Sequence, residues 1–429
     1  MIKKTGYVVL SIISYGILES ILLGYDYYIA LMILLFFIIS ADIIVFNYSG
    51  SLLLDNLNID REIDTKTFRK NRPFQIKLRF NNRNKYSISV YFFDEVLDTL
   101  DISKEHSGLI HIPAHGKKEI NYTVTPKYIG KHSLGDVKVN LYDTFKLAYI
   151  EKNFRIGMDI KIGPSHDNIK GNRTEMISNF LYTFGTHYSR NVGQGYNLYD
   201  IRPYNEDDDP RYIIWNRYDE ENNNIMVKEM EEEREITMIF LIDYSASMNN
   251  GSRDRIFDKT ITEIINSSYY ILKNRDNVGF FIFSSEINYF IKPDKNGNSI
   301  KKLEQIIAGI LPAGFFDIKQ AISELNKKVR KKYIIFIITA DDVSVKEPVK
   351  TYNTTVFLIN KETFYEYSPD NSFDDLLFKS FKLNELRRLN TQIKFLRSYG
   401  LKCKYINKDE IARKIIIEYN YDRSINMGA

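Results

Sequence analysis

The hydrophobic pattern begins with two long apolar stretches. Residues 6–24 and 27–46 are almost wholly apolar, and only Tyr25 and Asp26 separate them. A helix needs about 20 residues to cross the hydrocarbon core of a bilayer, and both stretches are near that length. Neither ends in the small-residue cleavage pattern of a signal peptide. The pattern therefore predicts a transmembrane helical hairpin within residues 1–50.

The charges around these stretches predict an orientation. Lys3 and Lys4 precede the first stretch, the tip at residues 25–26 has no basic residue, and basic residues return from Arg61 onward. Cytoplasmic flanks carry the excess of Lys and Arg. We therefore expect a multi-pass protein of the cell membrane whose soluble domains are cytoplasmic.

A second pattern, of short alternating runs, covers residues 60–160. Period-two alternation is typical of half-buried strands, and no long helical pattern interrupts it. The turns between the runs are rich in Asn, Pro and Gly. This region is predicted to be a small β-sandwich domain that acts as a spacer or binding module. The predicted strands are residues 74–80, 87–93, 119–124 and 136–141.

A third pattern, from residue 236 to residue 429, alternates continuous apolar runs with helical spacing. Such runs are expected for parallel strands buried on both faces, and the alternation predicts a doubly wound α/β sheet. The predicted strands are residues 236–242, 278–283, 333–338, 355–359 and 401–406. The predicted helices are residues 256–272, 299–310, 318–329 and 383–399.

The composition of the chain limits the kinds of binding site that it can contain. The net charge of +4 is too small to indicate nucleic-acid binding, and no dense Lys/Arg stripe is interleaved with aromatic residues. Cys403 is the only cysteine, which excludes an intramolecular disulfide and a cysteine-based zinc site. Its place in an alternating run favours a packed core thiol over a nucleophile. No phosphate-binding glycine loop or other small-molecule substrate motif is present.

The most informative short motif follows the first buried run of the α/β region. Asp243, Ser245 and Ser247 alternate in a loop between that run and a predicted helix. Ligands bind at the carboxyl ends of strands in open α/β sheets, and hard oxygen ligands suit Mg²⁺ or Mn²⁺. The alternative is that a serine simply caps the following helix.

This motif resembles the metal-ion-dependent adhesion site of von Willebrand factor A domains, in which those three side chains hold the ion. The resemblance implies two more ligands, a threonine from a later loop and an aspartate after a central strand. The threonine position falls on Phe316, which cannot ligate. The aspartate is either displaced to Asp341 or lost. The resemblance implies an incomplete ion site formed by Asp243, Ser245, Ser247 and Asp341.

A second resemblance covers most of the chain. Residues 195–204, which end in Arg202-Pro203-Tyr204, lead into the segment 208–215, which ends in Trp215. This block, with the pieces 128–135 and 143–147 upstream, is similar to the signature of the domain of unknown function family fifty-eight. We expect residues 161–235 to form a signature linker. Arg202, Asp208, Asp209 and Arg211 are expected to pin it against the sheet, with Trp215 as a packing anchor.

The family resemblance implies a MoxR-type AAA+ ATPase as partner. The leading hypothesis is a non-enzymatic, membrane-anchored, metal-assisted adaptor that works with such an ATPase in protein complex assembly or maturation. One alternative is a structural membrane scaffold with a vestigial ion site. Another is a metal-dependent hydrolase that uses Asp243 with Asp341 or Asp342, although no acid–base constellation in a pocket is evident from the sequence.

Overall fold

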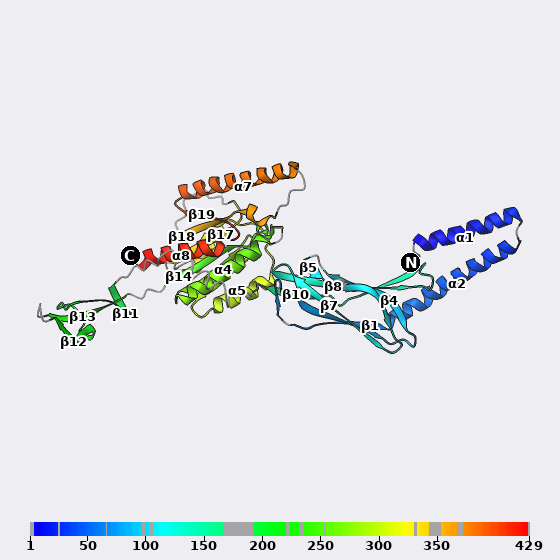
Figure 1. Ribbon diagram of the computed structural model, residues 1–429, viewed down its shortest axis with the longest axis horizontal. Helices are drawn as coiled ribbons and strands as arrows, with labels where there is room; N and C mark the ends of the chain where they lie inside the picture. The colour runs from blue at the N-terminus through cyan, green and yellow to red at the C-terminus, as the bar shows by residue number, and fades with distance from the viewer. Residues whose placement is uncertain are drawn as a thin grey trace. The chain divides into compact units, whose positions relative to one another are not determined.

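The computed structural model of the chain describes residues 4–24, 26–65, 67–96, 99–102, 106–165, 192–219, 224–231, 236–252, 254–329, 333–342, 353–366 and 372–427. Contacts divide the chain into two units, residues 1–165 and 166–429. The mixed α/β architecture and the N-terminal pair of apolar helices are as predicted (Figure 1).

The first unit begins with helices α1 (Lys4–Leu23) and α2 (Asp26–Asp55). They run in opposite directions and touch where Gly16 lies against the side chain of Met32 (Figure 1). Both are long and apolar enough to cross a membrane, a test that a core helix or a signal sequence also passes. Most of their apolar side chains are exposed, which is unlike a core helix. α2 continues nine residues beyond the predicted stretch that ends at residue 46.

Two sheets follow in the first unit. The four-stranded sheet has the order β1-β3-β7-β5, and the other sheet has the order β2-β10-β8-β4-β6, with β9 paired to β8. All pairings are antiparallel except that of β2 with β10. The strands are β1 (Leu57–Ile63), β2 (Phe68–Arg69), β3 (Phe74–Asn82), β4 (Ile88–Val96), β5 (Leu100–Ile102), β6 (Ser107–Ile112), β7 (Lys117–Pro126), β8 (Gly130–Tyr142), β9 (Tyr149–Phe154) and β10 (Met158–Gly163).

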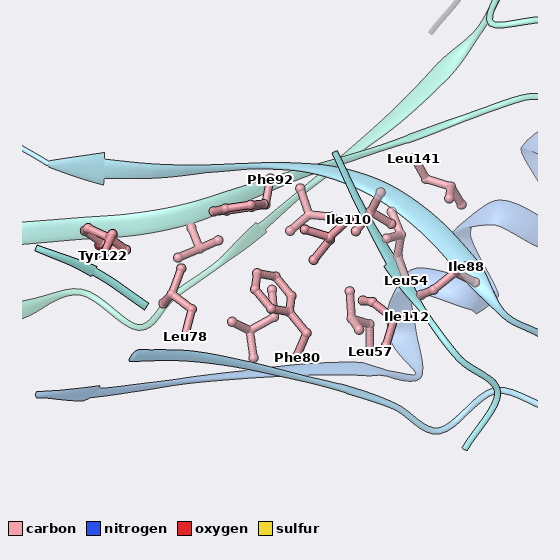
Figure 2. Packing of buried hydrophobic residues seen from close by; sticks show 14 of the residues in the cluster. Leu54, Leu57, Leu78, Phe80, Ile88, Phe92, Ile110, Ile112, Tyr122 and Leu141 are labelled. Atoms are coloured by element: carbon pink, nitrogen blue, oxygen red, sulfur yellow. The ribbon is translucent and has the colours of Figure 1, made fainter. Parts of the chain in front are cut away.

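The two sheets share one apolar core. The buried positions of β3 and β4 alternate with exposed or half-buried ones, so that each strand turns one face inward. Figure 2 shows Leu78 and Phe80 of β3 facing Phe92 of β4, and the rings of Phe80 and Phe92 meet edge to face. Leu54, from the end of α2, belongs to the same core. The sandwich is therefore continuous with the second apolar helix.

The second unit contains a small antiparallel sheet where the sequence predicts a linker. Its order is β11-β13-β12. The strands are β11 (Val192–Pro203), β12 (Ile213–Asp219) and β13 (Asn224–Glu231), with the short helix η2 (Pro210–Tyr212) before β12. The part of the predicted linker that is described from residue 192 onward is thus a strand-built element.

The larger sheet of this unit has the order β16-β15-β14-β17-β18-β19, and all neighbours are parallel except β16 with β15. The strands are β14 (Thr237–Asp243), β15 (Asn277–Phe283), β16 (Asn288–Asp294), β17 (Ile334–Thr339), β18 (Thr354–Ile359) and β19 (Lys402–Ile406). The helices are η3 (Ala246–Asn249), α4 (Ile256–Lys273), α5 (Asn298–Gly309), α6 (Ile318–Lys328), η4 (Lys361–Phe364), α7 (Ser372–Ser398) and α8 (Ile411–Met427).

Helices cover both faces of this sheet (Figure 1). Ile239 and Leu241 of β14 pack in one cluster with residues of α6 and α7. The alternate positions of a strand point to the opposite face, and there Tyr244 meets Phe257 of α4. β14 lies between β15 and β17, both parallel to it, and its residues from Met238 onward are buried. The carboxyl ends of β14 and β17 therefore lie side by side.

Candidate functional site

The candidate site begins where β14 ends, at Asp243. The carboxyl group is buried, and each of its oxygens accepts a hydrogen bond. Oδ1 accepts from the backbone N–H of Ser245 at 2.8 Å, and Oδ2 accepts from the hydroxyl of Thr339 at 2.7 Å. Burial raises the pKa of Asp243 to about 6, and the charge of Asp341 acts in the same direction.

Ser245 links the first loop to Asp341. Its hydroxyl donates to Asp341 Oδ2 at 3.1 Å and is hydrogen-bonded to the hydroxyl of Ser247 at 2.9 Å. The structure thus brings together all four residues proposed as ligands from the sequence. They come from the loops after β14 and β17, two adjacent parallel strands.

Thr339 is a member of the cluster that sequence reasoning missed. It is the last residue of β17 and is fully buried. While its hydroxyl donates to Asp243, it also accepts the backbone N–H of Asp341 at 3.0 Å. Thr339 therefore connects the carboxylate of Asp243 to the backbone of Asp341. The position of Thr339 after a buried run places it at the same sheet edge as Asp243, but the contact itself depends on the register of β14 and β17.

Asp341 and Asp342 have different surroundings. Asp342 is exposed and pairs with Arg388 of α7 at 2.6 Å. Asp341 faces Ser245, and its Oδ1 is 3.9 Å from Nζ of Lys361. Of the two aspartates, Asp341 is the one that lies at the cluster.

The loop before α6 closes the same edge of the sheet. Ala246 donates its N–H to the carbonyl of Gly314, and Ala313 donates to the carbonyl of Tyr244. Gly314 has a φ of +73°, and a Cβ there would lie 2.3 Å from the Ser285 hydroxyl, so the turn requires glycine. The backbone of this loop is thereby held against the first ligand loop.

Phe316 occupies the position that the family pattern gives to a threonine ligand. Only 8% of it is exposed, and its ring packs against Phe283 with centroids 6.3 Å apart. The neighbouring Phe315 is 64% exposed. The loop thus contributes a core residue at the ligand position and places an aromatic ring in solvent beside the cluster.

The donors of this cluster fit a small divalent cation. Carboxylate and hydroxyl oxygens are hard ligands of the kind that Mg²⁺ and Mn²⁺ prefer. The carboxylates of Asp243 and Asp341 lie close together, and burial disfavours the charged form of Asp243. Across the described ranges, no group of three or more His, Cys, Asp or Glu side chains is placed to hold a metal. Hydroxyls would therefore have to supply part of the coordination.

The charge network of the signature block lies within the small sheet. Arg202 binds Asp208 through two hydrogen bonds, at 2.7 and 2.6 Å, and reaches Glu229 of β13 at 2.5 Å. The hydrogen bonds from Arg202 lower the pKa of Asp208. Asp209 and Arg211 form a separate pair in η2, where Asp209 also caps the turn. The network therefore ties β11 to β13 and to the segment that precedes η2.

Two other predicted residues have clear positions. Trp215 is 74% exposed, so the packing role expected from the sequence is not what the structure describes. Cys403 is buried in the core of the large sheet, and burial raises the pKa of its thiol to about 12. A packed core thiol, as the sequence favours, has this environment.

Comparisons with solved structures give only distant likenesses. The ASH/PapD-like domain of human CEP192 is 13% identical, with 24% of this chain and 82% of that chain covered and a TM-score of 0.19. A FixG-related protein from Vibrio parahaemolyticus is 10% identical, with coverages of 24% and 96% and a TM-score of 0.18. The conserved hypothetical protein BatB from Bacteroides thetaiotaomicron is 12% identical, with coverages of 44% and 99% and a TM-score of 0.29. At such TM-scores none bears on function.

No curated protein matches the chain significantly. A family model does match, over residues 200–351, a range that includes most of the block at residues 195–215 and all four proposed ligands. This segment matches the family described as "Protein of unknown function DUF58".

Proposed function

We propose that this protein is a membrane-anchored adaptor whose larger α/β domain binds a partner protein through a divalent ion. The ion is Mg²⁺ or Mn²⁺, and Asp243, Ser245, Ser247 and Asp341 hold it. When bound, it supplies a positive centre with open positions that a partner's carboxylate can complete. The proposed partner is a MoxR-type AAA+ ATPase, which the family resemblance implies.

The observation that carries this proposal is the meeting of two ligand loops at one sheet edge. Ser245 from the loop after β14 is hydrogen-bonded to Asp341 from the loop after β17. Thr339 holds the buried Asp243 at the same point. No cationic side chain pairs with Asp243 in the described part of the chain, so bringing two carboxylates together here is costly, and a cation removes much of that cost.

The sheet order supports the assignment of a von Willebrand factor A-like fold. Its parallel strands carry helices on both faces, and a single antiparallel strand, β16, lies at one edge. The central strand β14 delivers the first ligand at its carboxyl end, which is where open α/β sheets bind ligands. These features support a binding role for the edge that contains Asp243.

The two apolar helices support a membrane anchor. α1 and α2 are of spanning length, and their exposed apolar surface has no other described protein element to cover it. Lys4 lies at the start of α1, and the tip between the helices carries no basic residue. By the positive-inside rule the soluble units lie on the cytoplasmic side.

A second candidate function is a membrane scaffold with a vestigial ion site. Two observations favour it: Phe316 replaces a ligand of the family pattern, and the ammonium group of Lys361 lies beside Asp341. A basic side chain at that distance reduces the electrostatic demand for a metal ion. The two candidates differ in whether partner binding depends on the ion.

Affinity capture of the tagged full-length protein from its native membranes tests the proposal. Captures are run with Mg²⁺, with a chelator, and with the Asp243→Ala variant in Mg²⁺. Asp342→Ala is the matched control, because Asp342 follows the adjacent strand β17, beside Asp341, but pairs with Arg388. An AAA+ ATPase captured by the wild type and Asp342→Ala in Mg²⁺, and lost in the other two samples, supports the adaptor. Identical partners in all samples favour the scaffold.

A further inference from the structure

Helix α2 is longer than a membrane crossing requires. A 30 Å hydrocarbon core takes about 20 residues at 1.5 Å each, and α2 has 30 residues. Its last part packs on the β-sandwich, because Gly50 lies against Ile150 and Leu54 is in the sandwich core. Lys152 of β9 binds the end of α2 through Asp55 at 2.7 Å. The sandwich is thus fixed to the helix by packing as well as by the chain.

The turn between β8 and β9 reaches further back along α2. The hydroxyl of Thr144 donates to Oδ1 of Asp42 at 3.0 Å. The turn has a defined shape: Asp143 accepts the N–H of Ala148 at 2.8 Å, and its carbonyl accepts the N–H of Lys146 at 3.1 Å. A structured turn of the sandwich therefore lies beside the segment of α2 that begins at Asp42.

The packing of the two apolar helices places the segment of α2 that begins at Asp42 at the edge of the apolar region. Gly16 of α1 lies against Met32 of α2. In an antiparallel pair, twelve residues back from Gly16 is Lys4, and twelve residues on from Met32 is Ile44. Lys4, the first helical residue of α1, is therefore roughly level with Ile44. A basic helix start of this kind belongs at the membrane–water boundary.

The side chains exposed at this level suit a bilayer interface. Phe145, at the tip of the turn, is 51% exposed, and the next residue, Lys146, is also exposed. Tyr48, one turn beyond Ile44 on α2, is 78% exposed. Aromatic rings concentrate at headgroup depth, and lysines there place an ammonium among the phosphates.

We propose that the turn of residues 143–146 is a membrane-surface contact, in which Phe145 enters the headgroup–acyl boundary and Lys146 faces lipid phosphates. The inference rests on the proposed membrane crossing of α1 and α2. The contact adds a second attachment point beside α2 and limits rotation of the β-sandwich about the helix. The β-sandwich is then a rigid platform on the membrane.

Depth-dependent tryptophan quenching in the full-length protein tests this contact. Trp215 is the only tryptophan, so a Trp215→Phe background allows one probe to be placed at a time. The variants are Phe145→Trp, Phe37→Trp within α2, and Met158→Trp as the soluble control. Met158 pairs with Leu134 of β8. Leu134 is eight residues from Tyr142, the end of β8 next to the turn, so at 3.3 Å per residue Met158 lies about 26 Å from the turn. Each variant is placed in phosphatidylcholine–phosphatidylglycerol vesicles brominated near the top of the acyl chains.

The proposal expects Phe37→Trp and Phe145→Trp to lose at least half of their emission in brominated vesicles, and Met158→Trp to be unchanged. If Phe37→Trp is quenched and Phe145→Trp is not, the helices cross but the turn stays in water, and this inference is overturned alone. A Phe145→Trp probe shielded from aqueous iodide but unquenched by lipid would indicate a protein neighbour and also overturn it. If Phe37→Trp is unquenched, the membrane crossing and the inference both fail.

Discussion

The side chains of Ser245 and Asp341 are 96 residues apart in the chain and are joined by a hydrogen bond of 3.1 Å. The bond connects the loops that follow β14 and β17, and the parallel pairing of these strands makes it possible. Asp243 ends β14, and the other residues of the proposed ion site lie in these two loops. The site therefore lies at the carboxyl ends of two adjacent strands in the sheet, and Thr339 holds Asp243 there through a hydrogen bond.

The ionised form of Asp243 is expected to destabilise the ion-free protein. Its pKa is about 6 in the folded chain, against 3.8 for an unperturbed aspartate. Between these values the folded state binds a proton that the unfolded state lacks, so stability falls as the pH rises through this window. Asp243→Asn removes that cost of about 3 kcal/mol, which exceeds the loss of about 1 kcal/mol from the one hydrogen bond that an amide nitrogen cannot accept. In chelator, well above pH 6, Asp243→Asn should therefore have the higher Tm.

Addition of Mg²⁺ should reverse this order, because an ion that binds only the folded wild type stabilises it. Thermal unfolding of both proteins, with chelator and with Mg²⁺, measures the effect. Asp342→Asn serves as a control and should respond to Mg²⁺ as the wild type does. A wild type that is the more stable protein in chelator would contradict the raised pKa.

Restoring the family's threonine at Phe316 should damage the fold without improving the site. Phe316 is buried against Phe283, so Phe316→Thr leaves a cavity and is expected to cost about 3–5 kcal/mol. Phe315→Thr, in the exposed neighbour, should change stability by about 0.5 kcal/mol or less. Denaturant unfolding compares the two. A Phe316→Thr variant of wild-type stability with tighter Mn²⁺ binding would show that the side chain turns toward the cluster.

A buried ion pair between the two sheets of the sandwich gives a separate prediction. Arg61 of β1 binds Asp94 of β4 and also donates to the carbonyl of Gly135 at 2.9 Å, while Tyr122 of β7 donates to Asp94. Asp94→Ala leaves a buried guanidinium unpaired and should cost about 3–5 kcal/mol. Tyr122→Phe, which removes a single hydrogen bond to a charged group, should cost about 1.5–3 kcal/mol. Urea unfolding measures the free energy of unfolding of both variants. Equal and small losses in that free energy would contradict the expected order.

Cys403 should be inert in the folded protein. Its thiol is buried, and burial raises its pKa to about 12, so almost none is thiolate at neutral pH. A disulfide-exchange reagent should react rapidly in strong denaturant and slower by at least about 100-fold under native conditions. Absorbance of the released thiolate measures both rates. Fast reaction of the native protein would place Cys403 at the surface.

The strands that could be predicted are those whose sequence shows either a continuous apolar run or a regular alternation of apolar and polar residues. The apolar run at residues 278–283 corresponds to β15, and the alternating run at residues 74–80 corresponds to most of β3. β16 was missed because an edge strand has no continuous buried run, and Asn288–Asp294 reads as a polar and aromatic mixture. The end of α2 was missed because Asn47, Ser49 and Gly50 interrupt the apolar run.

The site was predictable as far as sequence motifs and strand ends allow. Asp243, Ser245 and Ser247 form a local pattern, and Asp341 follows the next predicted central strand. Thr339 could not be assigned its contact with Asp243 without the register of β14 and β17. The small sheet β11-β13-β12 was expected to be a linker, because its main polar contact joins Arg202 to Glu229 of another strand. Such contacts depend on pairing that no local pattern encodes.

Direct binding of Mn²⁺ tests the central claim most plainly. Electron paramagnetic resonance of free Mn²⁺, titrated with the full-length protein in lipid vesicles, counts the ions bound. One bound ion is expected for the wild type and for Asp342→Ala, and a loss of affinity of at least tenfold for Asp243→Ala and for Ser245→Ala. Competition by Mg²⁺ should release the bound Mn²⁺. Binding that is absent from the wild type, or equal in Asp243→Ala, would contradict an ion site at the ends of β14 and β17.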